Sequence, residues 1–241
     1  MLTVNNVSKR FGGVSALTNV SFTIEPGSFV GIIGPNGSGK TTLFNIISGT
    51  YGPSQGDVLF EGRAVTGLPP HAICRAGIAR TFQIPQPIKT LTIAENVMLG
   101  AIFGREKDRD RHWEEAAREK AIKLIDFVGL TANVDAPPDR LTAGDLRKLE
   151  LARALATNPK TLLADEIMSG LNREELKEAS TILQKVREEL GVTIIWVEHI
   201  MHVLMKLVER VIVLSYGVQI CDGTPDVVCN DQRVIEAYLG Q

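Results

Sequence analysis

The sequence has few cysteines, no long apolar run and almost no net charge, and each of these features excludes a class of protein. Its three cysteines, Cys74, Cys221 and Cys229, are an odd number without metal-ligand spacing, so we expect structural thiols and neither a disulfide framework nor a zinc site. No uninterrupted apolar stretch approaches the ~18 residues of a membrane-spanning helix. The start of the chain lacks the basic and apolar segments of a secretory signal. We therefore expect a cytoplasmic chain that is not itself a channel.

The charge is balanced and the apolar content is high. The chain has 26 basic and 28 acidic residues, a formal net charge of −2, which gives no general attraction to nucleic acid or to anionic lipid. We therefore expect no nucleic-acid partner. With 44% apolar residues among 241, the chain can bury one large core, either as a single domain or as a domain with an inserted lobe.

The first third of the chain combines two kinds of strand pattern. Short β-branched and aromatic stretches at residues 2–4, 20–24 and 57–60 predict an antiparallel β layer. Between them, the continuous apolar run 29–33 is typical of a parallel strand that is covered on both faces. A glycine-rich segment and a helical pattern over residues 41–48 follow it. This segment therefore predicts a strand, a loop and a helix in succession.

The rest of the chain predicts helices followed by further parallel strands. Helical periodicity dominates residues 85–159, and strand patterns return at 161–164, 192–197 and 211–214, with a helix over 173–190. We therefore predict an α/β fold in a single domain, 1–241. It has a mainly parallel core sheet, an N-terminal antiparallel β layer, and residues 85–159 as an inserted helical subdomain.

The glycine-rich segment fits the phosphate-loop pattern G-x-x-x-x-G-K-[ST] with the required strand before it and helix after it. Its glycines allow backbone N–H groups to surround an anion, and the helix directs its positive end toward the phosphates. Lys40 supplies a point charge to the β and γ phosphates, and the Thr41 hydroxyl suits Mg²⁺. The predicted ATP-binding residues are Gly34, Pro35, Asn36, Gly37, Ser38, Gly39, Lys40, Thr41 and Thr42.

Two carboxylates end the apolar strand at 161–164. An Asp-Glu pair after a strand is usually only a polar loop, but together with a phosphate loop it predicts a metal and water site. We expect Asp165 to lie beside Mg²⁺ and Glu166 to orient the attacking water as the catalytic base. The Gln83 amide, where sheet gives way to helices, is placed to reach the same metal or water and to report on them to the lobe. The predicted metal ligands are thus Thr41, Gln83 and Asp165.

His199 follows the apolar strand 192–197. An isolated histidine is more often a surface or core residue than a functional one, but a position at a strand end favours a functional role. We therefore include His199 with Glu166 and Gln83 among the candidate catalytic residues.

These features, in this order, resemble the ATP-binding cassette of ABC transporters over essentially the whole chain. The resemblance implies that Phe11 stacks on adenine, that Gln83 links the site to the helical lobe and that residues 169–172 form the D loop. It also implies that Glu166 is the catalytic glutamate and that His199 is the switch histidine that senses the γ-phosphate.

The resemblance further implies a head-to-tail dimer, in which the signature loop of one subunit closes the nucleotide site of the other. The family's signature usually reads Leu-Ser-Gly-Gly-Gln, whereas residues 141–145 of this chain read Leu-Thr-Ala-Gly-Asp. Thr142 keeps the hydroxyl and Gly144 keeps a bare backbone beside the phosphate. Asp145 brings a negative charge toward a polyanion, which predicts a weaker signature contact.

Several short stretches are similar to the ATPase subunits of importers for branched-chain and other hydrophobic amino acids; they lie at 77–83, 170–172, 197–199, 214–217 and 234–240. This resemblance implies two membrane permease subunits, a second ATPase subunit that is identical or different, and an extracytoplasmic solute-binding protein as an indirect partner. The chain would then lie on the inner face of the cell membrane, bound to the permeases. It would hydrolyse ATP with Mg²⁺ to energise uptake.

Two alternatives remain at this point. One is a soluble ABC ATPase that acts in DNA repair or on ribosomes, although such proteins usually carry long coiled-coil insertions or two cassettes. The other is a nucleotide-sensing subunit with weak turnover, which the altered signature at Ala143 and Asp145 suggests.

Overall fold

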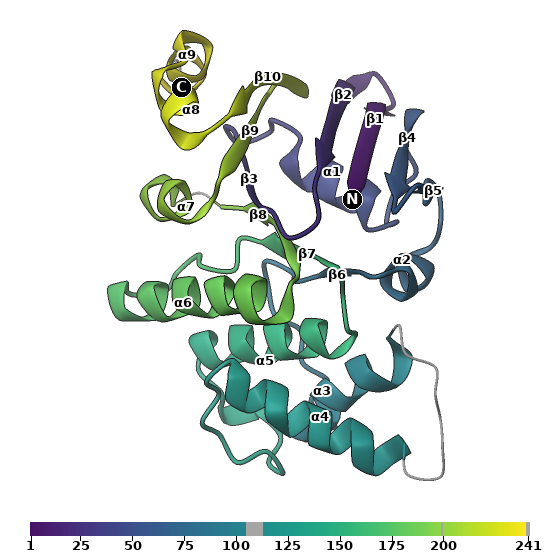
Figure 1. The fold of residues 1–241 in the computed structure, drawn as a ribbon, viewed down its shortest axis with the longest axis vertical. Coiled ribbons are helices and arrows are strands. Elements are labelled where there is room, and N and C mark those ends of the chain that lie inside the picture. Colours follow the sequence, from purple (N-terminus) through teal and green to yellow (C-terminus); the bar gives the residue numbers. More distant parts are fainter. Residues whose placement is uncertain (105–112, 199, 240–241) are drawn as a thin grey trace.

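A computed structural model of the protein describes residues 1–104, 113–198 and 200–239, and contains two β-sheets with helices packed between and beside them (Figure 1). Within these ranges, none of the helices combines the length and the hydropathy needed to cross a membrane.

The amino-terminal strands form the antiparallel layer that the sequence predicts. The strand order is β2-β1-β4-β5, and Leu2 of β1 faces Ile24 on one neighbour and Phe60 on the other. These three side chains are buried, so the sheet has one apolar face. The strands are β1 (Leu2–Phe11), β2 (Val14–Ile24), β4 (Gln55–Phe60) and β5 (Arg63–Ala64).

The second sheet is the predicted parallel core. Its strand order is β10-β9-β3-β8-β7-β6, and every pair is parallel except β9 with β10. All residues of β3, β7 and β8 are buried, which confirms that these strands are covered on both faces. The strands are β3 (Phe29–Ile33), β6 (Ile78–Arg80), β7 (Thr161–Asp165), β8 (Thr193–Val197), β9 (Arg210–Ser215) and β10 (Val218–Gly223).

Each face of the parallel sheet packs on a different apolar core. Along β8, Ile195 and Val197 belong to a core shared with α1 (Lys40–Ile47) and the antiparallel sheet. Ile194 and Trp196 face the other core, which continues into the helices. Helix α1 therefore lies between the two sheets (Figure 1), and its first residues lie at the carboxyl end of β3.

Three helices pack together at one end of the molecule, below α6 (Arg173–Leu190) in Figure 1. They are α3 (Ile93–Phe103), α4 (Trp113–Phe127) and α5 (Ala143–Ala156). All three lie within the predicted lobe, and their buried side chains share one cluster with strands β7 and β8. The limits of a separate subdomain at residues 85 and 159 stay a prediction.

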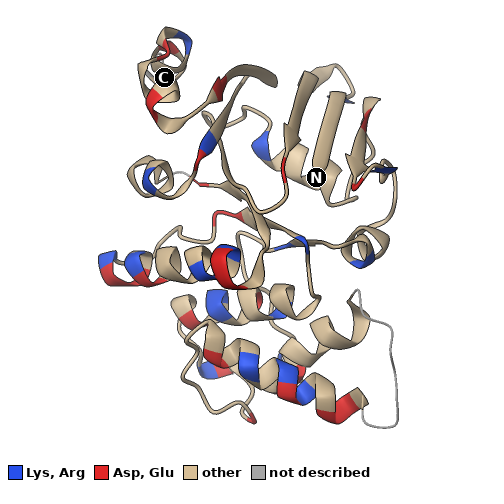
Figure 2. Cartoon of the chain, viewed as in Figure 1, with Lys and Arg blue, Asp and Glu red and all other residues tan. Residues whose placement is uncertain are grey.

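The remaining helices are short. They are α2 (Pro70–Ala76), the 3-10 helix η1 (Pro138–Arg140), α7 (Met201–Leu207), α8 (Pro225–Asn230) and α9 (Gln232–Leu239). Acidic and basic residues are interspersed along α4 and α6, and few lie on the visible faces of β1 and β2 (Figure 2).

Candidate nucleotide-binding site

The loop between β3 and α1 has glycines at positions that no other residue fits. Gly34 has a φ of +154°, and an added Cβ would lie 2.1 Å from the carbonyl oxygen of Leu214 in β9. Gly39 has a φ of +104°, and an added Cβ would lie 2.7 Å from the carbonyl oxygen of Ala16 in β2. Because these atoms cannot approach so closely, both positions require glycine. The loop backbone is thus packed against both sheets.

Lys40 is buried in this loop, with 6% of its surface exposed. Its Nζ donates hydrogen bonds to the carbonyl oxygens of Gly34 at 2.7 Å and Pro35 at 2.9 Å. Burial lowers the pKa of Lys40, and the nearby carboxylates of Glu166 and Asp165 oppose this shift. The lysine charge is therefore held at the mouth of the loop and beside both predicted carboxylates.

The other predicted loop residues line the same turn. Asn36, Gly37 and Thr41 are exposed, Thr42 is half-buried, and Ser38 is buried beneath them. The exposed positions leave one side of the turn open to a ligand, and Thr41 lies in the first turn of α1.

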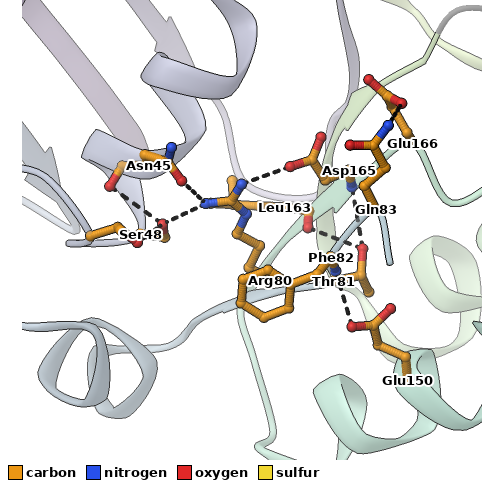
Figure 3. Close-up of polar contacts among 11 residues, drawn as sticks. Asn45, Ser48, Arg80, Thr81, Phe82, Gln83, Glu150, Leu163, Asp165 and Glu166 are labelled. Atoms are coloured by element: carbon orange, nitrogen blue, oxygen red, sulfur yellow. Dashed lines mark hydrogen bonds and ion pairs between the residues drawn. The ribbon is translucent and has the colours of Figure 1, made fainter. Parts of the chain in front are cut away.

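Asp165 is the last residue of β7 and forms a buried ion pair. Its Oδ2 accepts a hydrogen bond from Nη2 of Arg80, the last residue of β6, at 2.7 Å (Figure 3). Burial raises the pKa of Asp165, and the Arg80 guanidinium opposes this shift. Both side chains are less than a tenth exposed, so each charge depends on the other for compensation.

Glu166 and Gln83 contact each other directly. The Gln83 Nε2 donates a hydrogen bond of 2.6 Å to the Glu166 Oε2 (Figure 3). Glu166 has a φ of +47°, a left-handed conformation that costs a non-glycine residue about 1 kcal/mol or more. Its backbone N–H bonds the Val197 carbonyl oxygen at 2.9 Å, which fixes this turn at the end of β8. Such strain is common where a side chain must point into a site.

A second buried carboxylate holds the segment that carries Gln83. Glu150 of α5 is 4% exposed, and its Oε1 accepts a hydrogen bond of 3.1 Å from the backbone N–H of Phe82. Burial raises the pKa of Glu150 to about 7. Because Gln83 directly follows Phe82, this bond joins the site to the helices at the lower end of Figure 1.

The structure thus brings four predicted residues together, Lys40, Gln83, Asp165 and Glu166. Arg80 and Glu150 belong to the same cluster and were not predicted from the sequence. One signal was available for each: Arg80 is the charged residue of a short strand pattern, and Glu150 lies among apolar residues of its helix.

Phe11 and the signature residues lie apart from this cluster. The Phe11 ring is 45% exposed and packs edge-on against Tyr51 at 5.5 Å between centroids. Thr142 and Gly144 line a pocket between α5 and α6 to which no described residue of the phosphate loop contributes. His199 lies outside the described residues.

The donor set fits a single magnesium ion and not a multi-carboxylate cage. Among the described residues, no three His, Cys, Asp or Glu side chains are grouped to hold a metal. Thr41, Asp165 and Gln83 offer a hydroxyl, a carboxylate and an amide oxygen, which are the hard ligands that Mg²⁺ takes together with phosphate oxygens and water.

Comparisons with known proteins extend these observations. A family model described as ABC transporter matches residues 17–169, and one described as branched-chain amino acid ATP-binding cassette transporter matches residues 219–241. The probable branched-chain amino acid transport ATP-binding protein LivG of Archaeoglobus fulgidus is 38% identical, over 100% of this chain and 95% of its own length. The high-affinity LivG protein of Escherichia coli K12 is 35% identical, over 100% and 98% of the two chains.

Solved structures agree with this result. The ADP conformation of MJ1267, an ATP-binding cassette of an ABC transporter, is similar with a TM-score of 0.88 and 31% identity, over 100% of this chain and 99% of that one. A dimeric, post-hydrolysis state of the cassette MJ0796 bound to ADP and Pi gives a TM-score of 0.83 and 31% identity, over 93% and 99%. Because the first family model covers more than half of the chain and the relatives align over all of it, this chain belongs to the ATP-binding cassette family of ABC transporters.

Proposed function

We propose that this chain binds ATP with Mg²⁺ at residues 34–41 and hydrolyses it to drive uptake of branched-chain amino acids through separate permeases. The convergence of Lys40, Gln83, Asp165 and Glu166 at one edge of the parallel sheet carries the proposal. These residues come from three separate segments of the chain, and they are the groups that phosphoryl transfer requires: a cation, a metal ligand and a residue that orients water.

Each residue has a distinct role in this mechanism. The loop backbone and Lys40 bind the phosphates and stabilise the charge on the transferred group. Thr41, Asp165 and Gln83 would hold Mg²⁺, which would neutralise charge on the phosphate oxygens when bound. Glu166 accepts a hydrogen bond from the attacking water and orients it, and Gln83 holds the Glu166 carboxylate in place through the 2.6 Å bond. We assign His199 to γ-phosphate sensing and Phe11 to adenine stacking by the family resemblance.

A second ATPase subunit completes the site in this proposal. Thr142 and Gly144 lie at the amino-terminal end of α5, apart from the phosphate loop of the same chain. In a head-to-tail pair they would contact the nucleotide of the partner through a hydroxyl and a bare backbone. The dimeric relative bound to ADP and Pi supports the pairing of two cassettes.

A groove beside Gln83 is our candidate for the contact with the permease. It is lined by residues of α2, α3, β6 and α5, among them Glu150 and Arg153. Phe82 and Phe103 border it and are 53% and 57% exposed, although large aromatic side chains usually lie inside. A permease bound there would contact the segment that holds Gln83, so nucleotide binding and transport would be coupled. The chain would then be held at the inner face of the cell membrane.

The transported solute contacts the permeases and an extracytoplasmic binding protein, so the proposal for branched-chain amino acids is supported by the relatives alone. Both LivG proteins carry that description. Copurification of this chain with membrane permeases supports the importer; copurification with nucleic acid and no membrane protein would favour the soluble alternative.

Two substitutions test the ATPase. Lys40→Ala should abolish Mg²⁺-dependent ATP binding, measured by equilibrium binding of labelled ATP, because it removes the charge at the phosphates.

Glu166→Gln should keep ATP binding within about three-fold and reduce turnover by about 10²-fold or more, because it removes the group that orients water. Normal ATP binding by Lys40→Ala, or an unchanged rate in Glu166→Gln, would overturn the corresponding assignment.

The sensing alternative keeps one specific observation in its favour. The Thr142 hydroxyl donates a 2.7 Å hydrogen bond to the Asp145 carboxylate, which places a negative charge next to the group that would bind phosphate. A sensor binds ATP without productive turnover. The test measures ATP hydrolysis by the assembled complex, with the glutamate of each ATPase subunit substituted in turn. If this chain is a sensor, the hydrolysis rate stays unchanged when its own Glu166 is substituted; if it is a motor, the rate falls.

A further inference from the structure

Arg80 connects the two halves of the nucleotide site. It is the last residue of β6, and its side chain is 8% exposed and lies between α1 and β7 (Figure 3). Its Nη2 donates to Asp165 at 2.7 Å, and its Nη1 donates to Asn45 Oδ1 at 2.6 Å and to Ser48 Oγ at 3.0 Å. Helix α1, which contributes Asn45 and Ser48, begins with Lys40. One guanidinium therefore joins the helix of the phosphate loop to the carboxylate at the end of β7.

The surroundings of Arg80 do not favour burial of a charge for stability alone. Two rings offset part of the cost of burying this charge, because its guanidinium carbon lies within cation–π range of the ring centres, 5.7 Å from Phe44 and 5.3 Å from Phe82. Its Nε is buried and has no hydrogen-bond partner among the described residues. An unsatisfied buried donor destabilises a fold, and apolar residues often replace buried ion pairs without loss of stability. Stability alone therefore does not explain this buried pair.

The pair orients the carboxylate of Asp165. Arg80 holds the Oδ2 atom, whereas the Oδ1 atom makes no hydrogen bond within the described part of the chain. One oxygen is thus fixed by the protein and the other is left for an external ligand. A planar guanidinium can hold this geometry because its Nη1 and Nη2 groups bond to α1 and β7 at once, which a lysine ammonium on a flexible stem does less well.

We propose that Arg80 is a positioning residue that orients Asp165 toward Mg²⁺ and thereby sets how much Mg²⁺ strengthens ATP binding. This inference rests on the proposed function, because it requires Asp165 to be a ligand of the nucleotide-bound metal. In this proposal Arg80 acts through Asp165 and binds neither the metal nor the nucleotide itself. Partners that orient a metal ligand in this way typically change metal affinity by about 10–100-fold when they are substituted.

The test is the ratio of ATP affinity in MgCl₂ to ATP affinity in EDTA, measured by calorimetric titration of the full chain. Arg80→Met removes the charge and keeps a side chain of similar length. The ratio should fall by about ten-fold or more, whereas the affinity in EDTA should stay within about three-fold because Lys40 and the loop are unchanged. An unchanged ratio overturns the proposal.

Arg80→Lys covers the case in which Arg80→Met does not fold. It keeps the charge but cannot bond α1 and Asp165 at once, so the ratio should still fall, by less than in Arg80→Met. If Arg80→Lys has the same ratio as the wild type, a positive charge at this position is enough for the Mg²⁺ effect, and the proposal that Arg80 orients Asp165 is overturned. The matched control is Arg118→Met, which breaks an exposed ion pair of the same 2.7 Å length between α4 and Asp135 in the turn before η1, and which should leave the ratio unchanged.

A double-substitution cycle separates positioning from a general structural effect. If Arg80 acts through Asp165, then adding Arg80→Met to Asp165→Asn should not reduce the ratio further. A further independent fall would overturn the proposal. If the wild-type chain shows no gain in ATP affinity from Mg²⁺, the proposed function fails first; if the wild type shows the gain and Arg80→Met keeps it, only the role of Arg80 fails.

Discussion

Glu150 has a pKa of about 7 because burial, and not a strong charge partner, dominates its surroundings. The backbone N–H of Phe82 and the Arg153 guanidinium, 3.9 Å away, favour the charged form, but they do not offset the loss of water around a side chain that is 4% exposed. This carboxyl therefore changes its charge near neutral pH, next to the segment that carries Gln83.

We predict that Glu150→Gln stabilises the protein, relative to the wild type, increasingly as the pH rises. The raised pKa means that, between pH 4.5 and about 7, the folded wild type retains a proton that the unfolded chain releases, so its stability falls as pH rises. The loss reaches about 3 kcal/mol above pH 7. Glutamine keeps the acceptor for the Phe82 N–H and does not titrate. The difference in unfolding free energy, variant minus wild type, should therefore grow from pH 5 to pH 8 in urea denaturation.

Glu178→Gln is the matched control. Glu178 is on the surface, where its side chain is 47% exposed and pairs with Lys148. Its substitution should not reproduce the rise between pH 5 and pH 8. A Glu150→Gln difference that is constant over this range would contradict the expected titration.

At the scale of single residues, the sequence predicts the groups that a local pattern identifies. The phosphate loop has its own motif, and Asp165 and Glu166 follow an apolar strand. Arg80 and Glu150 were not predicted, because a charge in a sequence does not reveal whether the fold buries it. Their partners are 85 and 68 residues away along the chain, and only the parallel sheet and the packing of α5 bring them together.

At the scale of helices and strands, prediction succeeded where both ends of an element have local signals. Helix α6 spans the predicted residues 173–190 because Asn172 caps its first turn and Gly191 ends it in a left-handed conformation. Strand β3 spans the predicted 29–33 because its apolar run is followed by the constrained Gly34. Strand β10 and helices α8 and α9 were not predicted, since these elements are short and partly exposed. Their positions depend on packing: β10 pairs with β9, α8 packs on β9 and β10, and α9 packs on β10 and α8.

Two equivalent helix caps allow stability and function to be separated. Thr142 caps α5 and accepts a 3.1 Å hydrogen bond from the N–H of Asp145. Thr92 caps α3 in the same way, with a 3.2 Å bond from the N–H of Glu95. Both caps are reciprocal, since the acidic side chain accepts from the threonine N–H. They differ in two respects: the Thr142 hydroxyl also donates a 2.7 Å hydrogen bond to the Asp145 carboxylate, and only Thr142 belongs to the proposed signature loop.

We therefore predict that Thr142→Ala and Thr92→Ala lower the unfolding free energy by a similar amount, about 1 kcal/mol, as the loss of a cap does. Only Thr142→Ala should also reduce ATP hydrolysis by the assembled pair of subunits, by about ten-fold or more, because a hydrogen bond to a charged phosphate is worth about 1.5–3 kcal/mol. Denaturation and ATPase assays of both variants check this. Equal ATPase rates for the two variants would remove Thr142 from the composite site.

At the scale of the whole molecule, the carboxyl-terminal helix returns to the phosphate loop. The Tyr238 hydroxyl of α9 lies near the Gly34 backbone and donates a weak 3.9 Å hydrogen bond to the Met201 sulfur at the start of α7. Burial raises the pKa of Tyr238 to about 12, so the phenol stays neutral at physiological pH. Residues 219–241 match the branched-chain amino acid cassette model, so this contact lies within a segment typical of that group.

The last prediction is that the hydroxyl of Tyr238 stabilises the folded chain. Tyr238→Phe keeps the ring and removes the hydroxyl with its contacts to Met201 and Gly34, so the unfolding free energy should fall by about 0.5–1.5 kcal/mol in urea denaturation at pH 7. Tyr216→Phe is the matched control, because Tyr216 is 86% exposed and should change stability by less than about 0.5 kcal/mol. If both tyrosine variants are equally stable, the Tyr238 hydroxyl does not secure α9 beside the phosphate loop.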